Sequence, residues 1–247
     1  MLSRFKYHNR LIPKIWDKEN QLNHNVHKLL LDIVNEYIFF LSDIVKLPVS
    51  CSDIYDVLLH GSITNYYWDK HSDIDICIII DLSKIKQKLS GLDCFFIFNA
   101  LMDKWKKFFT MSVYGRNVDI WMMDASEFQQ KLANSIDTFY SLAQNKWILK
   151  PIQLQKSQIQ KVQHIAQKKY RVIMRQCRQI LRTKQPPVVI DKYLINIRKY
   201  RGLCAQTQHK HPLTSGVLAF KMARNTGIFT KMRKKSKKEL SKKFILK

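Results

Sequence analysis

The chain has 247 residues, of which 46% are hydrophobic and 25% are charged, close to the average of globular proteins. These proportions exclude a collagen-like, a low-complexity or a wholly disordered chain. The length is that of one large domain or two small ones. The longest apolar runs are five residues long, far below the ~20 needed to cross a bilayer, so we expect no membrane partner.

Positive charge is concentrated in the second part of the chain. The formal net charge is +24, yet residues 1–150 hold 18 Lys and Arg against 17 Asp and Glu. Residues 151–247 hold 25 basic residues against only two acidic ones. Because release of counterions from phosphates favours the binding of such a segment to a polyanion, we expect a nucleic acid as partner.

The cysteines and the first residues bear on the compartment. The five cysteines are widely spaced, without a pair at zinc-ligand spacing, which is typical of reduced thiols in an intracellular protein. Basic residues alternate with apolar ones over residues 1–16, as in a mitochondrial presequence. The pattern leaves two interpretations open, mitochondrial import or a cytoplasmic protein with a basic arm at 1–25.

The first predicted elements are a helix and two strands. Apolar residues at helical spacing predict a helix over 26–45, with Asn25 at its start. A short β-type run at 55–60 ends at Gly61-Ser62, and a second strand is expected at 73–81.

Residues 82–110 follow as mostly helical, with an interruption near Ser90-Gly91. A turn at 114–117 leads into a strand at 118–123, and a short helix is expected at 126–133. The composition changes at 147–151. We therefore expect an α+β domain at 26–150, in which a small mixed β-sheet has helices on one face.

The clearest helical pattern in the chain lies at 157–182. Its apolar stripe consists of Val162, Ala166, Tyr170, Ile173, Cys177 and Ile180. An opposite stripe is entirely basic and consists of Lys168, Arg171, Arg175, Arg178 and Arg182. We expect these basic residues to contact phosphates, rather than to form an ordinary solvated face, because no acidic residues compensate them.

Further helices are expected at 190–200 and 214–224, after Pro186-Pro187. They complete a basic helical domain at 151–230 that binds nucleic acid. The lysine-rich tail at 231–247 is expected to be disordered when free, and to be either a nonspecific clamp on phosphates or a targeting signal. Its candidate contacts are Lys234, Lys235, Lys237 and Lys238.

Two acidic residues on one predicted strand carry the chemistry. Asp73 and Asp75 project to the same face because side chains alternate along a strand. Two hard oxygen ligands together with substrate phosphates suit Mg²⁺, or Mn²⁺ in its place. Asp119, on the strand at 118–123, is expected to complete a metal-binding triad, with Asp124 as the competing candidate.

Gly61 and Ser62 precede this pair by ten intervening residues. Glycine allows the backbone to turn tightly beside a phosphate, and Ser62 offers a hydroxyl and an amide to the anion. We expect these two residues to bind the phosphates of a nucleotide.

The arrangement of Gly61-Ser62, the spacer, Ser72-Asp73-Ile74-Asp75 and the later Asp119 resembles the DNA polymerase β superfamily of nucleotidyltransferases. The resemblance covers about residues 26–150. It implies that Gly61 and Ser62 form the nucleotide-phosphate loop and that Asp73, Asp75 and Asp119 are the catalytic, metal-binding carboxylates. The subfamily stays open, because Ile63 to Trp68 depart from common forms of the signature.

The resulting hypothesis is an enzyme that adds NMP from an NTP to the 3′ end of an RNA, without a template and with Mg²⁺. RNA is the expected acceptor, with DNA as the alternative. The rival hypothesis is a noncatalytic RNA-binding subunit of a ribosome or another ribonucleoprotein, built on an inherited nucleotidyltransferase fold. A third hypothesis is nucleotidylation of a small molecule or a protein.

Other residues near the signature have two interpretations each. His60 and His71 are expected to be polar residues at strand ends rather than metal ligands, since neither has a second histidine at ligand spacing. The aromatic residues Tyr66, Tyr67 and Trp68 either stack a base or only cover the core.

Overall fold

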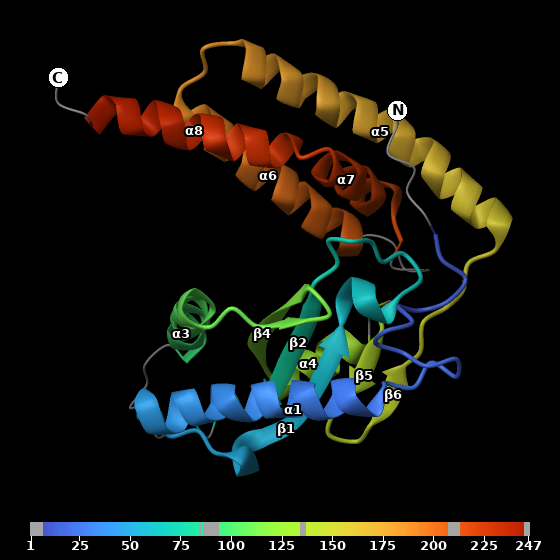
Figure 1. Ribbon diagram of the computed structural model, residues 1–247, viewed down its shortest axis with the longest axis vertical. Coiled ribbons are helices and arrows are strands. Elements are labelled where there is room, and N and C mark those ends of the chain that lie inside the picture. The colour runs from blue at the N-terminus through green and yellow to red at the C-terminus, as the bar shows by residue number, and fades with distance from the viewer. Residues whose placement is uncertain (1–6, 84, 86–93, 134–136, 207–212, 245–247) are drawn as a thin grey trace. The chain divides into compact units, whose positions relative to one another are not determined.

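The computed structural model describes residues 7–83, 85, 94–133, 137–206 and 213–244 (Figure 1). The chain divides into two compact units, Tyr7–Gln153 and Leu154–Lys247. The two units are described separately. The division lies close to the boundary expected at residue 150.

The unit Tyr7–Gln153 is built on a mixed six-stranded sheet with the order β3-β4-β2-β1-β5-β6. β2 and β4 are parallel, and the other neighbouring strands are antiparallel. This agrees with the α+β class and the mixed sheet expected from the sequence. The strands are β1 (Ile54–His60), β2 (Ile74–Ile80), β3 (Ser112–Val113), β4 (Arg116–Asp124), β5 (Phe139–Ser141) and β6 (Lys146–Leu149).

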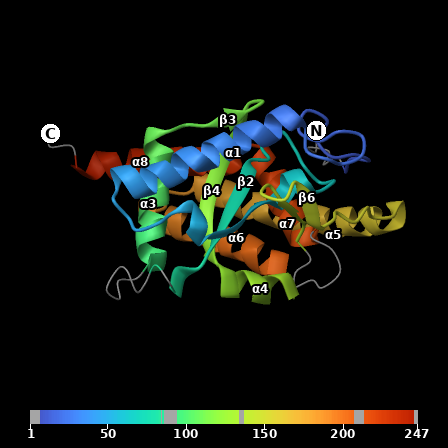
Figure 2. The ribbon, with the colours of Figure 1, turned by 90° about the horizontal axis from the view of Figure 1, so that it is seen from below.

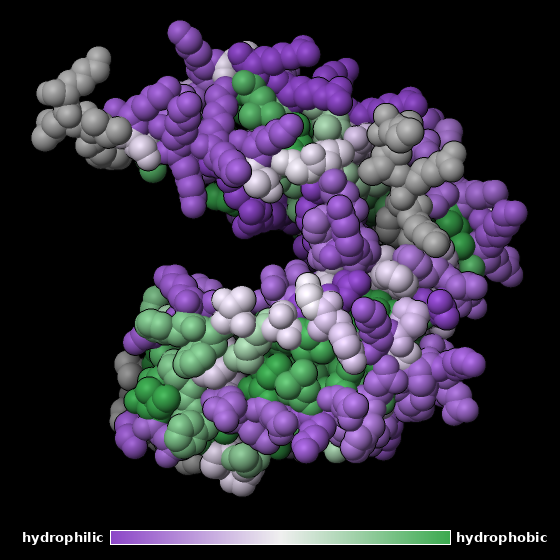
Figure 3. Space-filling model, in the orientation of Figure 1, coloured by the Kyte–Doolittle hydropathy of each residue, from purple (hydrophilic) through white to green (hydrophobic). Residues whose placement is uncertain are grey.

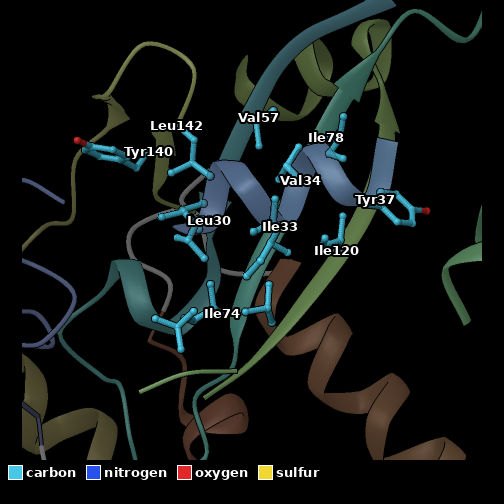
Figure 4. Close-up of a cluster of buried hydrophobic side chains, with 14 of the residues drawn as sticks. Leu30, Ile33, Val34, Tyr37, Val57, Ile74, Ile78, Ile120, Tyr140 and Leu142 are labelled. Carbon is cyan, nitrogen blue, oxygen red and sulfur yellow. The ribbon is translucent and has the colours of Figure 1, made fainter. Parts of the chain in front are cut away.

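One face of this sheet is covered by α1 (His24–Phe39), which continues into a π-helical segment, Phe40–Ile44. The apolar stripe of α1 points at alternate residues of the central strands (Figure 4). Because strand side chains alternate, these residues all lie on the same face. The contact joins Leu30, Ile33, Val34 and Tyr37 of α1 to Val57, Ile74, Ile78 and Ile120.

The expectation that helices cover only one face is wrong. Figure 2 shows α1 and α4 (Ala125–Ala133) on opposite sides of the sheet. Phe128 of α4 packs against Leu58, Cys77 and Met123. The side chains of these three strand residues point to the face opposite α1. The reason lies in β2, which has apolar side chains on both of its faces. Both faces must therefore be covered by other parts of the chain.

The third helix of this unit is α3 (Cys94–Phe108). The interruption expected near Ser90-Gly91 lies outside the described residues. Trp105 of α3 is buried, with its ring 5.4 Å from Tyr37 and 5.1 Å from Phe40, measured between centroids. These contacts hold α3 against the end of α1.

The described part of the predicted basic arm belongs to the core. Leu11, Ile15 and Trp16 are buried, and the Trp16 indole donates a hydrogen bond of 3.0 Å to the carbonyl of Ile63. Burial of these large apolar side chains stabilises the segment on the sheet unit. Residues 7–25 are therefore not a separate arm.

The second unit consists of four helices, as far as the described residues show: α5 (Lys156–Arg182), α6 (Pro187–Gln206), α7 (Ser215–Asn225) and α8 (Ile228–Phe244). Helix α5 packs against α7 and α8, and α6 against α7 and α8. The apolar stripe expected for α5 is its packed face, since Ala166, Tyr170, Ile173 and Cys177 are buried. The visible surface of these helices is mostly hydrophilic (Figure 3).

The lysine-rich tail is not disordered over its described part. Residues 228–244 form α8, in which Met232 and Ser236 are buried. The ammonium of Lys235 donates hydrogen bonds to the carbonyls of Ile180, Leu181 and Thr183 at 3.2, 2.9 and 2.6 Å. A lysine thus satisfies carbonyls at the C-terminal end of α5. Its positive charge there also interacts favourably with the negative end of the helix dipole.

Over the part of the chain that the structure describes, every helix is too short or too polar to span a bilayer.

Candidate active site and nucleic-acid interface

Asp75 and Asp119 lie side by side on neighbouring strands. In the parallel pairing of β2 with β4, Asp75 is the direct register partner of Asp119, and such strands are ~4.8 Å apart. On the other side of β2, Asp75 is paired with His60, the last residue of β1. These three residues therefore form one row across three strands, on the face that carries Cys77 and Trp121 further along.

The third acidic residue of the predicted triad, Asp73, directly precedes β2. It is half-buried, as are Asp75 and Asp119. The structure thus brings Asp75 and Asp119 together and places Asp73 two residues before the first of them.

Gly61 makes the closest approach to this row. Its φ is +83°, in the left-handed region that favours glycine. A Cβ at this position would collide with Oδ2 of Asp75 and lie 3.3 Å from its Cγ. The absence of a side chain at Gly61 is therefore what allows the turn to pass beside the Asp75 carboxylate.

A network of side-chain hydrogen bonds fixes the Gly61-Ser62 turn, which is the start of a 3-10 helix, Gly61–Thr64. The Gly61 carbonyl accepts from the Thr64 hydroxyl at 2.9 Å and from the Asn65 amide at 2.8 Å. Both side chains also contact the Thr138 hydroxyl, at 2.6 and 2.7 Å. Thr64, Asn65 and Thr138 are all buried, so the network is shielded from water.

The orientation of the Ser62 amide follows from this network. The carbonyl of Gly61 and the N–H of Ser62 belong to one trans peptide and point in opposite directions. Since the carbonyl is directed at Asn65 and Thr64, the Ser62 amide is directed away from them. The Ser62 amide therefore takes no part in this network.

Two cations of the chain lie close to the carboxylates. The Lys106 ammonium of α3 is 3.1 Å from Oδ1 of Asp119. Arg116, the first residue of β4, donates hydrogen bonds to the carbonyls of Asp69 and Ser72 at 2.9 and 2.7 Å. Burial lowers the pKa of Arg116, while the negative charges of Asp69 and Asp73 act in the opposite direction.

The carboxylates supply the hard oxygen ligands that Mg²⁺ prefers. Within the described ranges, no group of three or more His, Cys, Asp or Glu is already arranged to hold a metal ion. Mg²⁺ does not require such a group, since it is commonly held by one or two carboxylates together with substrate phosphates and water. The adjacent oxygen ligands of Asp75 and Asp119 fit that requirement.

His60 is held in its neutral form. Its Nε2 accepts a hydrogen bond of 2.9 Å from the Trp121 indole, which assigns the ring proton to Nδ1. Burial, assisted by the positive charge of Lys131, lowers the pKa of His60 to about 4. His60 is thus a neutral polar residue at a strand end, as expected.

The competing candidate, Asp124, has a structural position. It is the register partner of Ile80, at the opposite end of β2 from Asp75. Its Oδ1 accepts from the amide of Ser126 at 2.9 Å and its Oδ2 from the amide of Leu82 at 3.1 Å. Burial raises its pKa, but these hydrogen bonds outweigh that effect, so that the pKa is lowered.

The aromatic residues after the turn cover the core. Tyr66 and Tyr67 are buried, and Trp68 stacks on His8 with 3.5 Å between ring centroids. Of the two interpretations, the structure therefore favours packing. His71, the other histidine of the signature region, is exposed.

A second candidate surface lies along α5. All five residues of the predicted basic stripe are exposed, and within the described residues none of them forms an ion pair. Four of them line a hollow of about 730 Å³. The lining consists of Thr183, which directly follows α5, and of seven residues of α5: Tyr170, Arg171, Met174, Arg175, Arg178, Gln179 and Arg182.

The four arginines of this hollow extend for about 16 Å along the helix axis, at 1.5 Å per residue. Lys168 lies outside the hollow lining. On α8, Lys234, Lys237 and Lys238 are exposed, but Lys235 is engaged with the carbonyls at the end of α5. Lys235 therefore has a structural role at the end of α5, and its contact with phosphate stays a prediction.

Lys106, Arg116 and Thr138 were not identified from the sequence. Arg116 could have been found from its place in the turn that leads into the strand of Asp119. The contacts of Lys106 and Thr138 span 13 and 74 residues, and no local pattern marks them.

Compared with family models, with curated proteins and with solved structures, the chain matches none of them.

Replacing Gly61 by alanine tests the close approach to Asp75. Gly115 is the matched control, because its φ is +72° and an added Cβ would meet nothing within 4 Å. Gly115→Ala should lower the free energy of unfolding by about 1 kcal/mol, the cost of a left-handed non-glycine residue. Gly61→Ala should cost about 1–2 kcal/mol more in urea unfolding, and equal losses would contradict the steric role of Gly61.

The lowered pKa of His60 makes stability depend on pH. Between pH 6.5 and about 4 the unfolded chain binds a proton at His60 that the folded chain does not. The free energy of unfolding should therefore fall by up to about 3 kcal/mol as the pH decreases through this window. Urea unfolding across the window should show this slope reduced in His60→Gln and retained in His71→Gln.

Proposed function

We propose that the chain is a nucleotidyltransferase of the DNA polymerase β superfamily type, which adds NMP from an NTP to an RNA 3′ end. The observation that carries the proposal is the pairing of Asp75 with Asp119 beside Gly61. The sequence motif and the proximity of these three residues both support nucleotidyl transfer, although Gly61, Asp75 and Asp119 come from three separate segments.

In this proposal Asp73, Asp75 and Asp119 hold Mg²⁺. When bound, Mg²⁺ supplies charge stabilisation for the attacking and leaving oxygens of an in-line displacement. The Gly61-Ser62 turn holds the triphosphate, with the Ser62 amide as an anion donor. Its orientation is already fixed by Thr64, Asn65 and Thr138, so little reorganisation is needed on binding.

The bonds exchanged follow from this placement. The 3′ oxygen of the acceptor forms a bond to the α-phosphorus of the NTP, and the bond from that phosphorus to the β-phosphate oxygen breaks. Pyrophosphate leaves, and the proton of the 3′ hydroxyl passes to Asp119 or to water.

The acceptor is proposed to be RNA because of the unit Leu154–Lys247. The arginines of the α5 hollow are exposed and unpaired by acids within the described residues, which is the arrangement that phosphates neutralise most favourably. Lys168, Lys234, Lys237 and Lys238 would add charge around them. DNA is the alternative polymer with the same backbone chemistry.

One observation favours the rival function, a noncatalytic RNA-binding subunit of a ribonucleoprotein. Lys106 already pairs with Asp119, and Arg116 lies in the field of Asp73. A scaffold that had lost its metal would be stabilised by such pairs. The catalytic and the binding proposals therefore need separate tests.

The catalytic proposal is tested by incubating the protein with labelled NTPs, Mg²⁺ and an RNA oligomer. Asp75→Asn and Asp119→Asn should lower incorporation by at least about 100-fold, since even outer-shell partners of a metal are worth 10–100-fold. Asp103→Asn, on an exposed position of α3, is the matched control and should keep the wild-type rate. Failure of the wild type to incorporate any NTP, with RNA binding intact, would favour the rival function.

The binding proposal is tested on the α5 hollow. Arg175→Ala/Arg178→Ala should weaken RNA affinity at ~150 mM salt by about tenfold or more and reduce the salt slope by about 2. Arg198→Ala/Lys199→Ala removes the same charge from exposed positions of α6 and should have a smaller effect. Fluorescence anisotropy over a salt series gives both quantities, and equal effects of the two double variants would reject a specific role for the hollow.

A further inference from the structure

Lys106 is a cation in direct contact with one of the two paired carboxylates. Its ammonium lies 3.1 Å from Asp119, and the two side chains are 34% and 42% exposed. Neither residue has another charged partner within the described ranges. The pair is therefore held by a single contact that water can reach.

We propose that Lys106 is a displaceable internal counter-cation, which neutralises Asp119 when no metal is bound and competes with a divalent cation for this carboxylate. The inference rests on the proposed function, since it takes Asp75 and Asp119 as metal ligands. It adds that the metal affinity of the site is set partly by a residue that does not bind the metal.

The position of Lys106 is imposed by its neighbour. Trp105 is buried between Tyr37 and Phe40, which fixes α3 at this point of the helix. Lys106 follows directly and is directed to Asp119, whereas Lys107 is exposed and has no part in the ion pair. Two consecutive lysines thus carry the same charge in different environments.

Lys106 and Arg116 differ in how firmly they are held. Arg116 donates to two backbone carbonyls, of Asp69 and Ser72, and is partly buried. Leaving its position would break both of those hydrogen bonds in a partly buried place. Lys106 contacts only the Asp119 carboxylate, and its own side chain is flexible. It is therefore the cation that can leave the site more easily.

Charge explains why a cation is needed there at all. Asp75 and Asp119 are register partners, and two carboxylates at this spacing repel each other. One ammonium offsets part of that repulsion, and a divalent cation between both carboxylates offsets more. A divalent cation at these carboxylates therefore competes with Lys106 for the negative charge of Asp119.

The test measures Mn²⁺ binding to the full chain by electron paramagnetic resonance, without nucleotide. Lys106→Met should bind Mn²⁺ about two- to fivefold more tightly than wild type, which is the change in equilibrium that an exposed ion pair is worth. Lys106→Arg keeps the charge and should remain close to wild type. Lys107→Met is the matched control for net charge and should change the affinity less than Lys106→Met.

The outcomes separate this inference from the proposed function. Equal effects of Lys106→Met and Lys107→Met, with Mn²⁺ binding that Asp75→Asn abolishes, would overturn the role of Lys106 and leave the metal site in place. Mn²⁺ binding that is indifferent to Asp75→Asn, or absent from wild type and Lys106→Met alike, would overturn both.

Discussion

The parallel pairing of β2 with β4 is the constraint on which the candidate site depends. It makes Asp75 the partner of Asp119 and, by the same register, Cys77 the partner of Trp121 and Ile79 of Met123. A shift by one residue would move every side chain of the strand to the other face of the sheet. Because Ile74, Ile76 and Ile78 fill the core on the face that α1 covers, that shift would move the Asp75 carboxylate into this apolar core. Packing of the strand thus fixes the acidic row.

The negative charge of this row is partly offset by a cation beside it. Carboxylates on adjacent strands are costly unless cations are near. Lys106 supplies one to Asp119 from a helix, whereas Arg116, at the start of β4, lies near Asp69 and Asp73. His60, the third member of the row, contributes no charge near pH 7, because burial beside Trp121 and the charge of Lys131 keep it neutral. The positive charge that the row requires therefore comes from outside it.

Local patterns in the sequence were sufficient for the long elements. The apolar stripe of α5 and the β-type run of β2 are strong enough to be recognised without tertiary information. β5 and β6 have three and four residues, too few to show an alternation, and were not predicted. In α8 the apolar positions Ile228 and Met232 were hidden among lysines, whose composition is typical of disorder.

The residues of the candidate site likewise divide into those that a local sequence pattern predicted and those that it did not. Gly61, Ser62, Asp73 and Asp75 were predicted because their spacing is local, and Asp119 because of its apolar neighbours. The contacts of Lys106 and Thr138 depend on how α3 and the segment before β5 pack against the sheet. That packing is determined by the whole core and not by any local sequence pattern. Long-range contacts of single polar residues have no periodicity and therefore escape a reading of patterns.

The basic unit resolves a conflict between charge and folding. A helix with arginines at three- and four-residue spacing is destabilised by their repulsion, yet α5 extends over 27 residues. Its opposite face supplies the compensation, through burial of Tyr170, Ile173 and Cys177, and its end is held by Lys235. Burial of the apolar face and capping of the helix end thus stabilise α5 enough to offset the repulsion between its arginines, which have no acidic partners inside the described unit. Their charge is thus not compensated within the described unit, which is the observation on which the proposed binding of a phosphate polymer rests.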